Sequence, residues 1–73
     1  MTKNKLFRLI ENILKLKKGA ITERSESKDF EEWDSLGTIS LTLGIGENFD
    51  KSIPDDVFFS SVKEIIEYFE INK

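Results

Sequence analysis

Ser35 is the side chain best placed to carry out chemistry in this 73-residue chain. It stands between Asp34 and Leu36, where an acidic run ends and a weakly charged apolar segment begins. Because backbone N–H groups at a helix N-terminus receive anions, a serine hydroxyl at such a point is well placed to carry an attached anionic group. Asp and Ser are also favoured N-cap residues, so a simple capping role for Asp34 or Ser35 stays open as the alternative.

Composition gives little support to other kinds of catalysis. The chain has no cysteine and no histidine, which excludes a thiol nucleophile, a Cys/His zinc site and any imidazole base. An acidic cluster at residues 31–34 lies in a polar segment, where carboxylates are usually just solvated. The acids between Asp50 and Asp56 lack the alternating ligands and the glycine of a calcium loop. We therefore predict no metal site and no enzyme activity of the chain by itself.

Charge is distributed unevenly along the chain. Residues 1–18 hold six of the eleven Lys and Arg residues but only one of the fourteen Asp and Glu residues. The acidic remainder argues against nucleic acid as the main ligand, because phosphate binding needs concentrated basic side chains. Polar residues interrupt the apolar positions of the basic segment, so we predict neither a signal peptide nor a membrane span, and we expect a cytoplasmic protein.

The elements that must position Ser35 are predicted to be helices within one domain, residues 1–73. Apolar residues recur at spacings of three and four between residues 6 and 16, which predicts a first helix. Thr2 or Asn4 is its candidate cap, and its end is expected near Lys18 and Gly19. A long polar connection over residues 19–34 follows, with four candidate anchors to a core: Ala20, Ile21, Phe30 and Trp33.

A second helix is predicted from Ser35 to about Asn48. Its glycine-bearing face is expected to be exposed. The broad apolar arc on the other side is expected to face inward, and it consists of Leu36, Ile39, Leu41, Leu43, Ile45 and Phe49. Ile65 later in the chain is expected to face inward as well. Residues 55–59 after Pro54 are predicted to form a short helix. Ser60 or Ser61 is expected to cap a last helix. The fold class is therefore all-α, with three main helices, one short helix and a long loop between the first two.

The same residues resemble the acyl carrier protein family. Its members carry 4′-phosphopantetheine on the serine of an Asp-Ser-Leu motif at the start of their second helix, where Asp34, Ser35 and Leu36 stand. The resemblance continues through the aliphatic residues at 39, 41, 43 and 45, Phe49-Asp50, Ile53-Pro54-Asp55 and the closing VKEIIEYF at 62–69. It covers nearly the whole chain and implies an acyl-carrier-like bundle.

This resemblance implies a covalent cofactor and a set of partners. A phosphopantetheinyl transferase would attach 4′-phosphopantetheine from coenzyme A to Ser35, flanked by Asp34 and Leu36. The arm would tether acyl or aminoacyl thioesters for fatty-acid-like or specialised biosynthesis, in a protein expected to be a monomer. Contacts with the transferase and with acyl-loading and acyl-processing enzymes are implied for Leu36, Ile39, Ser40 and Glu47. An acyl-chain cleft is implied for Ile39, Leu43, Ile45 and Ile53.

Two features qualify the resemblance. Trp33, in place of the small residue of housekeeping carriers, resembles specialised stand-alone carriers. The alternative interpretation of the four residues implied for the cleft is that they are ordinary core residues. The alternative function is an unmodified small helical protein–protein interaction module. It would use Gly37, Ser40 and Gly44 to let a partner helix approach and would keep Ser35 only as a cap.

Overall fold

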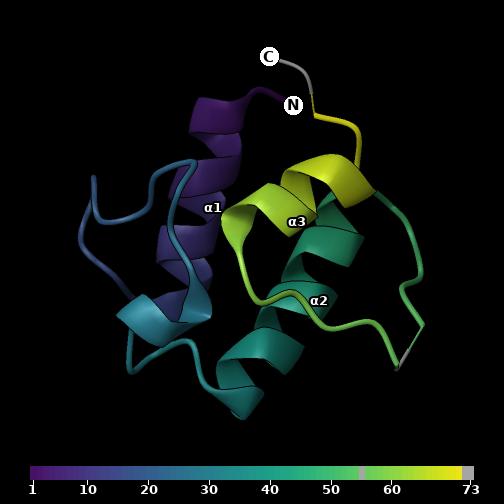
Figure 1. Ribbon diagram of the computed structural model, residues 1–73. Helices are drawn as coiled ribbons and strands as arrows, with labels where there is room; N and C mark the ends of the chain where they lie inside the picture. The colour runs from purple at the N-terminus through teal and green to yellow at the C-terminus, as the bar shows by residue number, and fades with distance from the viewer. Residues whose placement is uncertain (55, 72–73) are drawn as a thin grey trace.

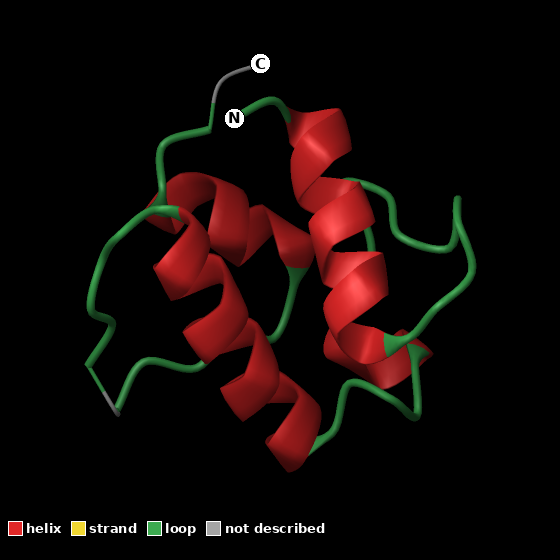
Figure 2. Cartoon of the chain, turned by 180° about the vertical axis from the view of Figure 1, so that it is seen from behind, coloured by secondary structure: helices red, strands yellow, loops and turns green. Residues whose placement is uncertain are grey.

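The computed structural model describes residues 1–54 and 56–71, in which three α-helices form the framework: α1 (Lys3–Leu14), α2 (Ser35–Asn48) and α3 (Val62–Tyr68). α1 and α2 pack against each other, and α3 lies toward the C-terminal end of α2 (Figures 1 and 2). A short 3₁₀ helix, η1 (Ser27–Asp29), lies in the connection before α2. Strand-like pairing within the described ranges is limited to an isolated bridge between Glu26 and Ser61. The predicted all-helical class is confirmed as a small three-helix bundle.

α1 begins where the sequence predicts but ends earlier. The Lys5 backbone N–H donates to Thr2 Oγ1 at 3.2 Å, so Thr2 is the cap of the two candidates. The helix stops at Leu14 because Lys15 adopts a left-handed backbone (φ 60°) and its N–H bonds back to the last turn. The predicted end near Lys18 and Gly19 was therefore wrong, and Gly19 (φ 93°) serves the following turn instead.

α2 has the predicted bounds, and Leu41 and Ile45 face inward as predicted, but the rest of the packed face differs from the prediction. Leu36 and Leu43 are 74% and 64% exposed, whereas five residues of α2 are buried: Gly37, Thr38, Leu41, Ile45 and Gly46. A Cβ at Gly37 would stand 2.2 Å from the carbonyl oxygen of Glu32. The glycine-bearing face is therefore the packed face, because only a residue without a side chain permits this approach. The inward orientation predicted for Leu36, Ile39 and Leu43 was wrong.

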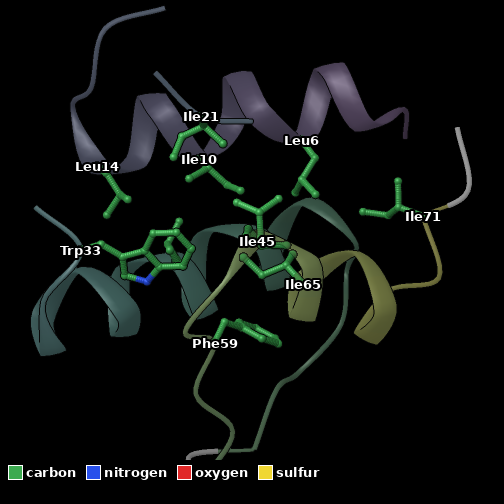
Figure 3. Packing of buried hydrophobic residues seen from close by; sticks show 11 residues of the cluster. Leu6, Ile10, Leu14, Ile21, Trp33, Ile45, Phe59, Ile65 and Ile71 are labelled. Atoms are coloured by element: carbon green, nitrogen blue, oxygen red, sulfur yellow. The ribbon is translucent and has the colours of Figure 1, made fainter. Parts of the chain in front are cut away.

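One hydrophobic core joins all three helices to the long connection (Figure 3). Ile21 and Trp33, two of the predicted anchors, are 2% and 3% exposed. The other two anchors, Ala20 and Phe30, are half-buried. The core consists of Leu6, Ile10, Leu14, Ile21, Trp33, Leu41, Ile45, Phe59, Val62, Ile65 and Ile71. The predicted anchoring of the connection is therefore confirmed, and so is the inward position of Ile65.

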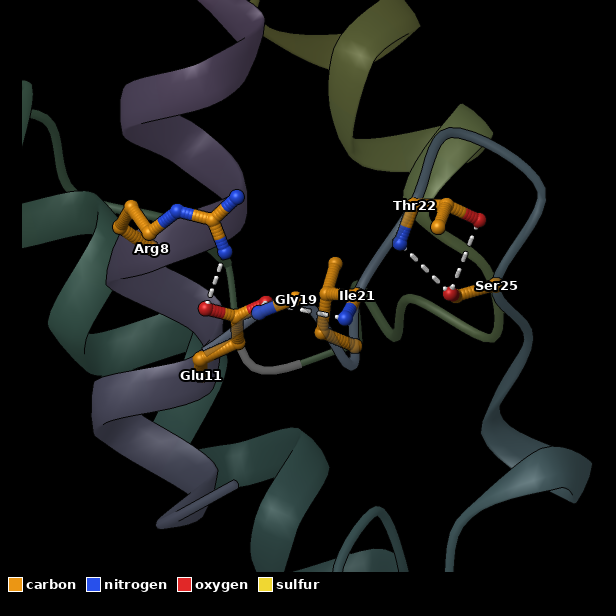
Figure 4. Close-up of polar contacts among 6 residues, drawn as sticks. All are labelled: Arg8, Glu11, Gly19, Ile21, Thr22 and Ser25. Atoms are coloured by element: carbon orange, nitrogen blue, oxygen red, sulfur yellow. Dashed lines mark hydrogen bonds and ion pairs between the residues drawn. The ribbon is translucent and has the colours of Figure 1, made fainter. Parts of the chain in front are cut away.

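A buried carboxylate ties α1 to the start of the connection. Glu11 is 3% exposed, and its Oε2 accepts hydrogen bonds from the backbone N–H groups of Gly19 at 3.0 Å and Ile21 at 2.9 Å (Figure 4). Its Oε1 accepts a hydrogen bond from the Arg8 guanidinium. Both carboxylate oxygens are thus paired, which is the condition for keeping a buried charge. In the sequence Glu11 only interrupts the apolar pattern, so this role was not predicted.

The segment before α3 is extended rather than helical. Residues 56–60 contain no helix, so the predicted short helix is absent there, and Asp55 lies outside the described residues. Ser60 instead accepts a hydrogen bond from the Ser27 N–H at 2.8 Å, and this pairing with the connection holds the chain extended. Ser61 then caps α3, since its Oγ accepts from the Glu64 N–H at 3.2 Å. The Glu64 carboxylate accepts in turn from the Ser60 and Ser61 hydroxyls.

Candidate functional site

Asp34 and Ser35 have different roles at the start of α2. Asp34 is the N-cap, because its Oδ1 accepts a hydrogen bond from the Gly37 N–H at 2.8 Å. Ser35 is the first residue of the helix, and its side chain is exposed. Its hydroxyl makes no hydrogen bond within the described part of the chain. Of the two capping alternatives, the structure therefore selects Asp34 and leaves the Ser35 hydroxyl free.

The chain before Ser35 is held in place by packing and by backbone hydrogen bonds. The Trp33 N–H donates to the Phe30 carbonyl oxygen at 3.2 Å, and the Thr38 N–H donates to the Asp34 carbonyl oxygen at 2.8 Å. The Trp33 ring is buried in the core. The position of Ser35 thus follows from a buried anchor on one side and a capped helix on the other.

Replacing Gly37 by alanine is expected to destabilise the fold and displace the chain before Ser35. The new Cβ would stand 2.2 Å from the Glu32 carbonyl oxygen and 3.1 Å from Leu14 Cδ2. Overpacking costs about 1–3 kcal/mol, and the helix-propensity gain of about 1 kcal/mol does not cancel a clash with backbone. Urea unfolding measures the effect. The exposed Ser40→Ala is the control, and equal stability of the two variants would refute the close approach.

Two hollows border the exposed side of α2 near Ser35. An open hollow of about 360 Å³ begins beside Asp34 and Ser35 and extends between Trp33, Ile39 and Phe58. A smaller hollow of about 80 Å³ follows farther along the helix. Ile39 and Phe58 border both of them. The two hollows therefore adjoin each other along α2, with Ile39 and Phe58 between them.

The structure brings together three of the four residues implied for an acyl-chain cleft. Ile39, Leu43 and Ile53 line the smaller hollow. Ile45 does not, because it is fully buried in the core between the helices. Ile45 is therefore an ordinary core residue, which was the alternative interpretation of the four cleft residues. Val57 and Phe58, which were not predicted from the sequence, also line it, together with Thr42 and Pro54.

The residues implied for partner contacts share one exposed face of α2. Leu36 and Ile39 are 74% and 48% exposed, and Ser40 and Glu47 are exposed as well. We call the exposed apolar residues here, Leu36, Ile39, Leu43 and Phe58, the apolar stripe. Exposed apolar patches of this kind mark interaction surfaces.

The glycine-bearing face suggested for an interaction module is not available to a partner. Gly37 is buried against the Glu32 carbonyl, and a Cβ at Gly44 would stand 2.6 Å from Ile13 Cδ1 of α1. The chain's own α1 and connection therefore occupy this face. Ser40, the third residue suggested for this face, is exposed.

Comparisons with known proteins leave this site without a family assignment. No protein-family model matches the chain, and no curated protein is significantly similar to it. Among residues 1–54 and 56–71, no group of three or more acidic side chains is arranged to hold a metal ion. None of the helices in the same residues is long and apolar enough to span a membrane.

Proposed function

We propose that this chain is a carrier protein that bears 4′-phosphopantetheine on Ser35 and presents acyl or aminoacyl thioesters to partner enzymes, similar to acyl carrier proteins. One observation carries the proposal. Asp34 caps α2, so the exposed Ser35 hydroxyl is left free for modification. A serine retained only for capping would be redundant beside this aspartate.

The residues around Ser35 fit this cofactor. The hydroxyl is accessible to a transferase, and it lies in the first turn of a 14-residue helix, whose N-terminus favours a phosphate. The hollow beside it offers room for part of a flexible arm. The arm supplies a terminal thiol that holds an acyl group as a thioester, so a chain without cysteine suits this role.

The attachment reaction requires only the hydroxyl of this chain. Ser35 Oγ forms a bond to the phosphorus of coenzyme A that carries the pantetheine. The bond from that phosphorus to the oxygen of adenosine 3′,5′-bisphosphate breaks, and the bisphosphate leaves with the electron pair. The hydroxyl proton passes to a base of the transferase, which also supplies magnesium. In this proposal Ser35 is modified rather than catalytic, and the chain is not an enzyme.

The surface around Ser35 supports roles in docking and in holding cargo. Leu36 and Ile39 of the apolar stripe flank the hydroxyl on the exposed face, where a transferase or an acyl-processing enzyme would bind. Ile39, Leu43 and Ile53 would contact the cargo in the smaller hollow. At about 80 Å³ this hollow is smaller than a cavity of about 150 Å³ that holds benzene. A short acyl or aminoacyl group therefore fits it better than a long alkyl chain.

Intact-mass measurement tests the attachment. The purified chain is incubated with coenzyme A, magnesium and a broad-specificity phosphopantetheinyl transferase, beside Ser35→Ala and Ser52→Ala variants. We expect the wild type and Ser52→Ala to gain one phosphopantetheine and Ser35→Ala to gain none. Ser52 is the matched control because it is an exposed serine outside the residues implied for partner contacts.

The second candidate is an unmodified interaction module that docks through the apolar stripe. The exposure of Leu36, Leu43 and Phe58 favours it, since each is more than half exposed. If several active transferases leave the folded wild-type chain unmodified, the carrier proposal is refuted and this candidate takes its place.

A further inference from the structure

Trp33 carries an unpaired hydrogen-bond donor. Its side chain is 3% exposed, and among the residues that the structure describes its indole Nε1 is buried without a partner. Buried polar groups are nearly always paired, because an unpaired one loses its bond to water without replacement. Trp33 is the single tryptophan of the chain. A buried indole N–H thus has to be explained by a ligand or by a cost to stability.

The tryptophan that carries the unpaired donor borders the hollow beside Ser35. Trp33, Ser35, Ile39 and Phe58 all border this space. The nitrogen-bearing edge of the indole ring faces away from α1 and toward the side on which Phe59 lies (Figure 3). Phe59 is another wall of the same hollow. A group attached to Ser35 would therefore enter a space beside this ring, and its acceptor would reach the covered nitrogen once the neighbouring wall moves aside.

We propose that this hollow is the binding subsite for the arm on Ser35, and that Trp33 Nε1–H donates to an amide carbonyl oxygen of that arm. The inference rests on the proposed attachment of phosphopantetheine. The phosphate itself stays at the exposed start of α2, because burying its charge without a cationic partner would be unfavourable. The uncharged part of the arm has methyl groups and amides, which suit the aromatic walls and the indole donor respectively.

The subsite gives the arm a direction. Ile39 and Phe58 separate the hollow at Ser35 from the smaller hollow farther along α2. An arm held by Trp33 would extend along α2 past these two side chains. The group on its thiol would then lie near Ile53 and Leu43. Trp33 is thus a positioning residue for the cargo, and it takes no part in the attachment reaction.

The indole resonance of the single tryptophan tests this contact directly. Nitrogen-15 NMR spectra of the wild-type chain are recorded before and after attachment, with complete conversion established by mass. We expect the indole proton to move downfield and its exchange with solvent to slow. The control is Ser35→Ala mixed with equimolar coenzyme A, in which the resonance should stay in place because the arm is not tethered.

The outcomes separate this inference from the proposed function. Failure to gain the mass would refute the attachment and the subsite together. Full mass gain with an unchanged indole resonance would leave the attachment standing and overturn the subsite.

A second variant tests the same hydrogen bond from the side of the arm. Trp33→Phe keeps an aromatic ring and removes the N–H, and it is loaded with an arm labelled with carbon-13 at its carbonyls. We expect one amide carbonyl resonance to move upfield relative to the loaded wild type. Identical carbonyl resonances in the two folded proteins would overturn the contact. If the variant does not fold, the wild-type comparison still decides.

Discussion

Replacing Glu11 by alanine is expected to lower the free energy of unfolding by about 1–3 kcal/mol for each backbone N–H group that it leaves without an acceptor. The substitution deletes the acceptor of the Gly19 and Ile21 backbone N–H groups and the partner of Arg8. Small domains have a total stability of about 5–15 kcal/mol. The loss would therefore remove a large share of the stability of this fold.

Urea unfolding followed by circular dichroism measures this loss. The matched control is Glu23→Ala, because Glu23 also pairs with a base near α1, Lys3 at 3.3 Å, but its side chain is 57% exposed. An exposed pair contributes about 0–1 kcal/mol. If Glu11→Ala costs no more than Glu23→Ala, the buried link between α1 and the connection does not stabilise the fold.

The same carboxylate gives the fold a dependence on acid pH. Burial opposes ionisation of Glu11, but the hydrogen bonds from Arg8, Ile21 and Gly19 and the charge of Arg8 outweigh it and lower the pKa of Glu11 below its ordinary value of 4.5. A carboxyl group with a lower pKa in the folded state stabilises the fold above its unfolded pKa, and this is lost as the pH falls through the folded pKa. Stability should therefore decline below about pH 4.5.

Glu11→Gln is the variant that isolates this titration. It keeps one acceptor oxygen and removes the ionisable group, so its stability should decline less steeply in acid than that of the wild type. A decline remains, because the hydrogen bond from Ser60 also lowers the pKa of Glu64. Equal acid slopes for Glu11→Gln and the wild type would show that Glu11 does not titrate with folding.

Local signals predicted the positions at which helices begin. Thr2, Asp34 and Ser61 are polar residues that precede apolar periodic segments, and each accepts a hydrogen bond from a backbone N–H of its helix. The end of α1 depends on a distant contact instead. Glu11 draws Gly19 and Ile21 back against the helix, and the chain turns at Lys15 rather than at the glycine.

The orientation of α2 and the details of the site could not be predicted from the sequence pattern. Apolar residues lie on all sides of α2, so their periodicity selects no face, and the close approach of Gly37 to Glu32 decides it. The motif predicted Ser35 at the start of a helix, but only the folded structure shows that Asp34 accepts the capping hydrogen bond. Nothing in the sequence could reveal that the Trp33 indole lacks an acceptor, since this depends on which parts of the folded chain surround the ring.

Two substitutions on α2 test the observed orientation of the helix. Ile45→Ala should cost about 2–5 kcal/mol, because it removes a fully buried side chain from the core. Leu36→Ala should change stability by less than about 0.5 kcal/mol, because its side chain is 74% exposed. Both substitutions shorten a branched aliphatic side chain on the same helix. The difference between their losses in free energy of unfolding therefore reports which of the two side chains points into the core. Urea unfolding measures both.

The Leu36 variant also bears on function, because Leu36 belongs to the exposed apolar stripe beside Ser35. If the apolar stripe docks a transferase, Leu36→Ala should be modified more slowly at Ser35 while its unfolding curve stays that of the wild type. A large loss of stability in Leu36→Ala with little in Ile45→Ala would instead mean that α2 turns its apolar stripe inward. That result would remove the exposed surface on which partner docking depends, whereas slow modification of a fully stable variant would locate docking beside the attachment serine.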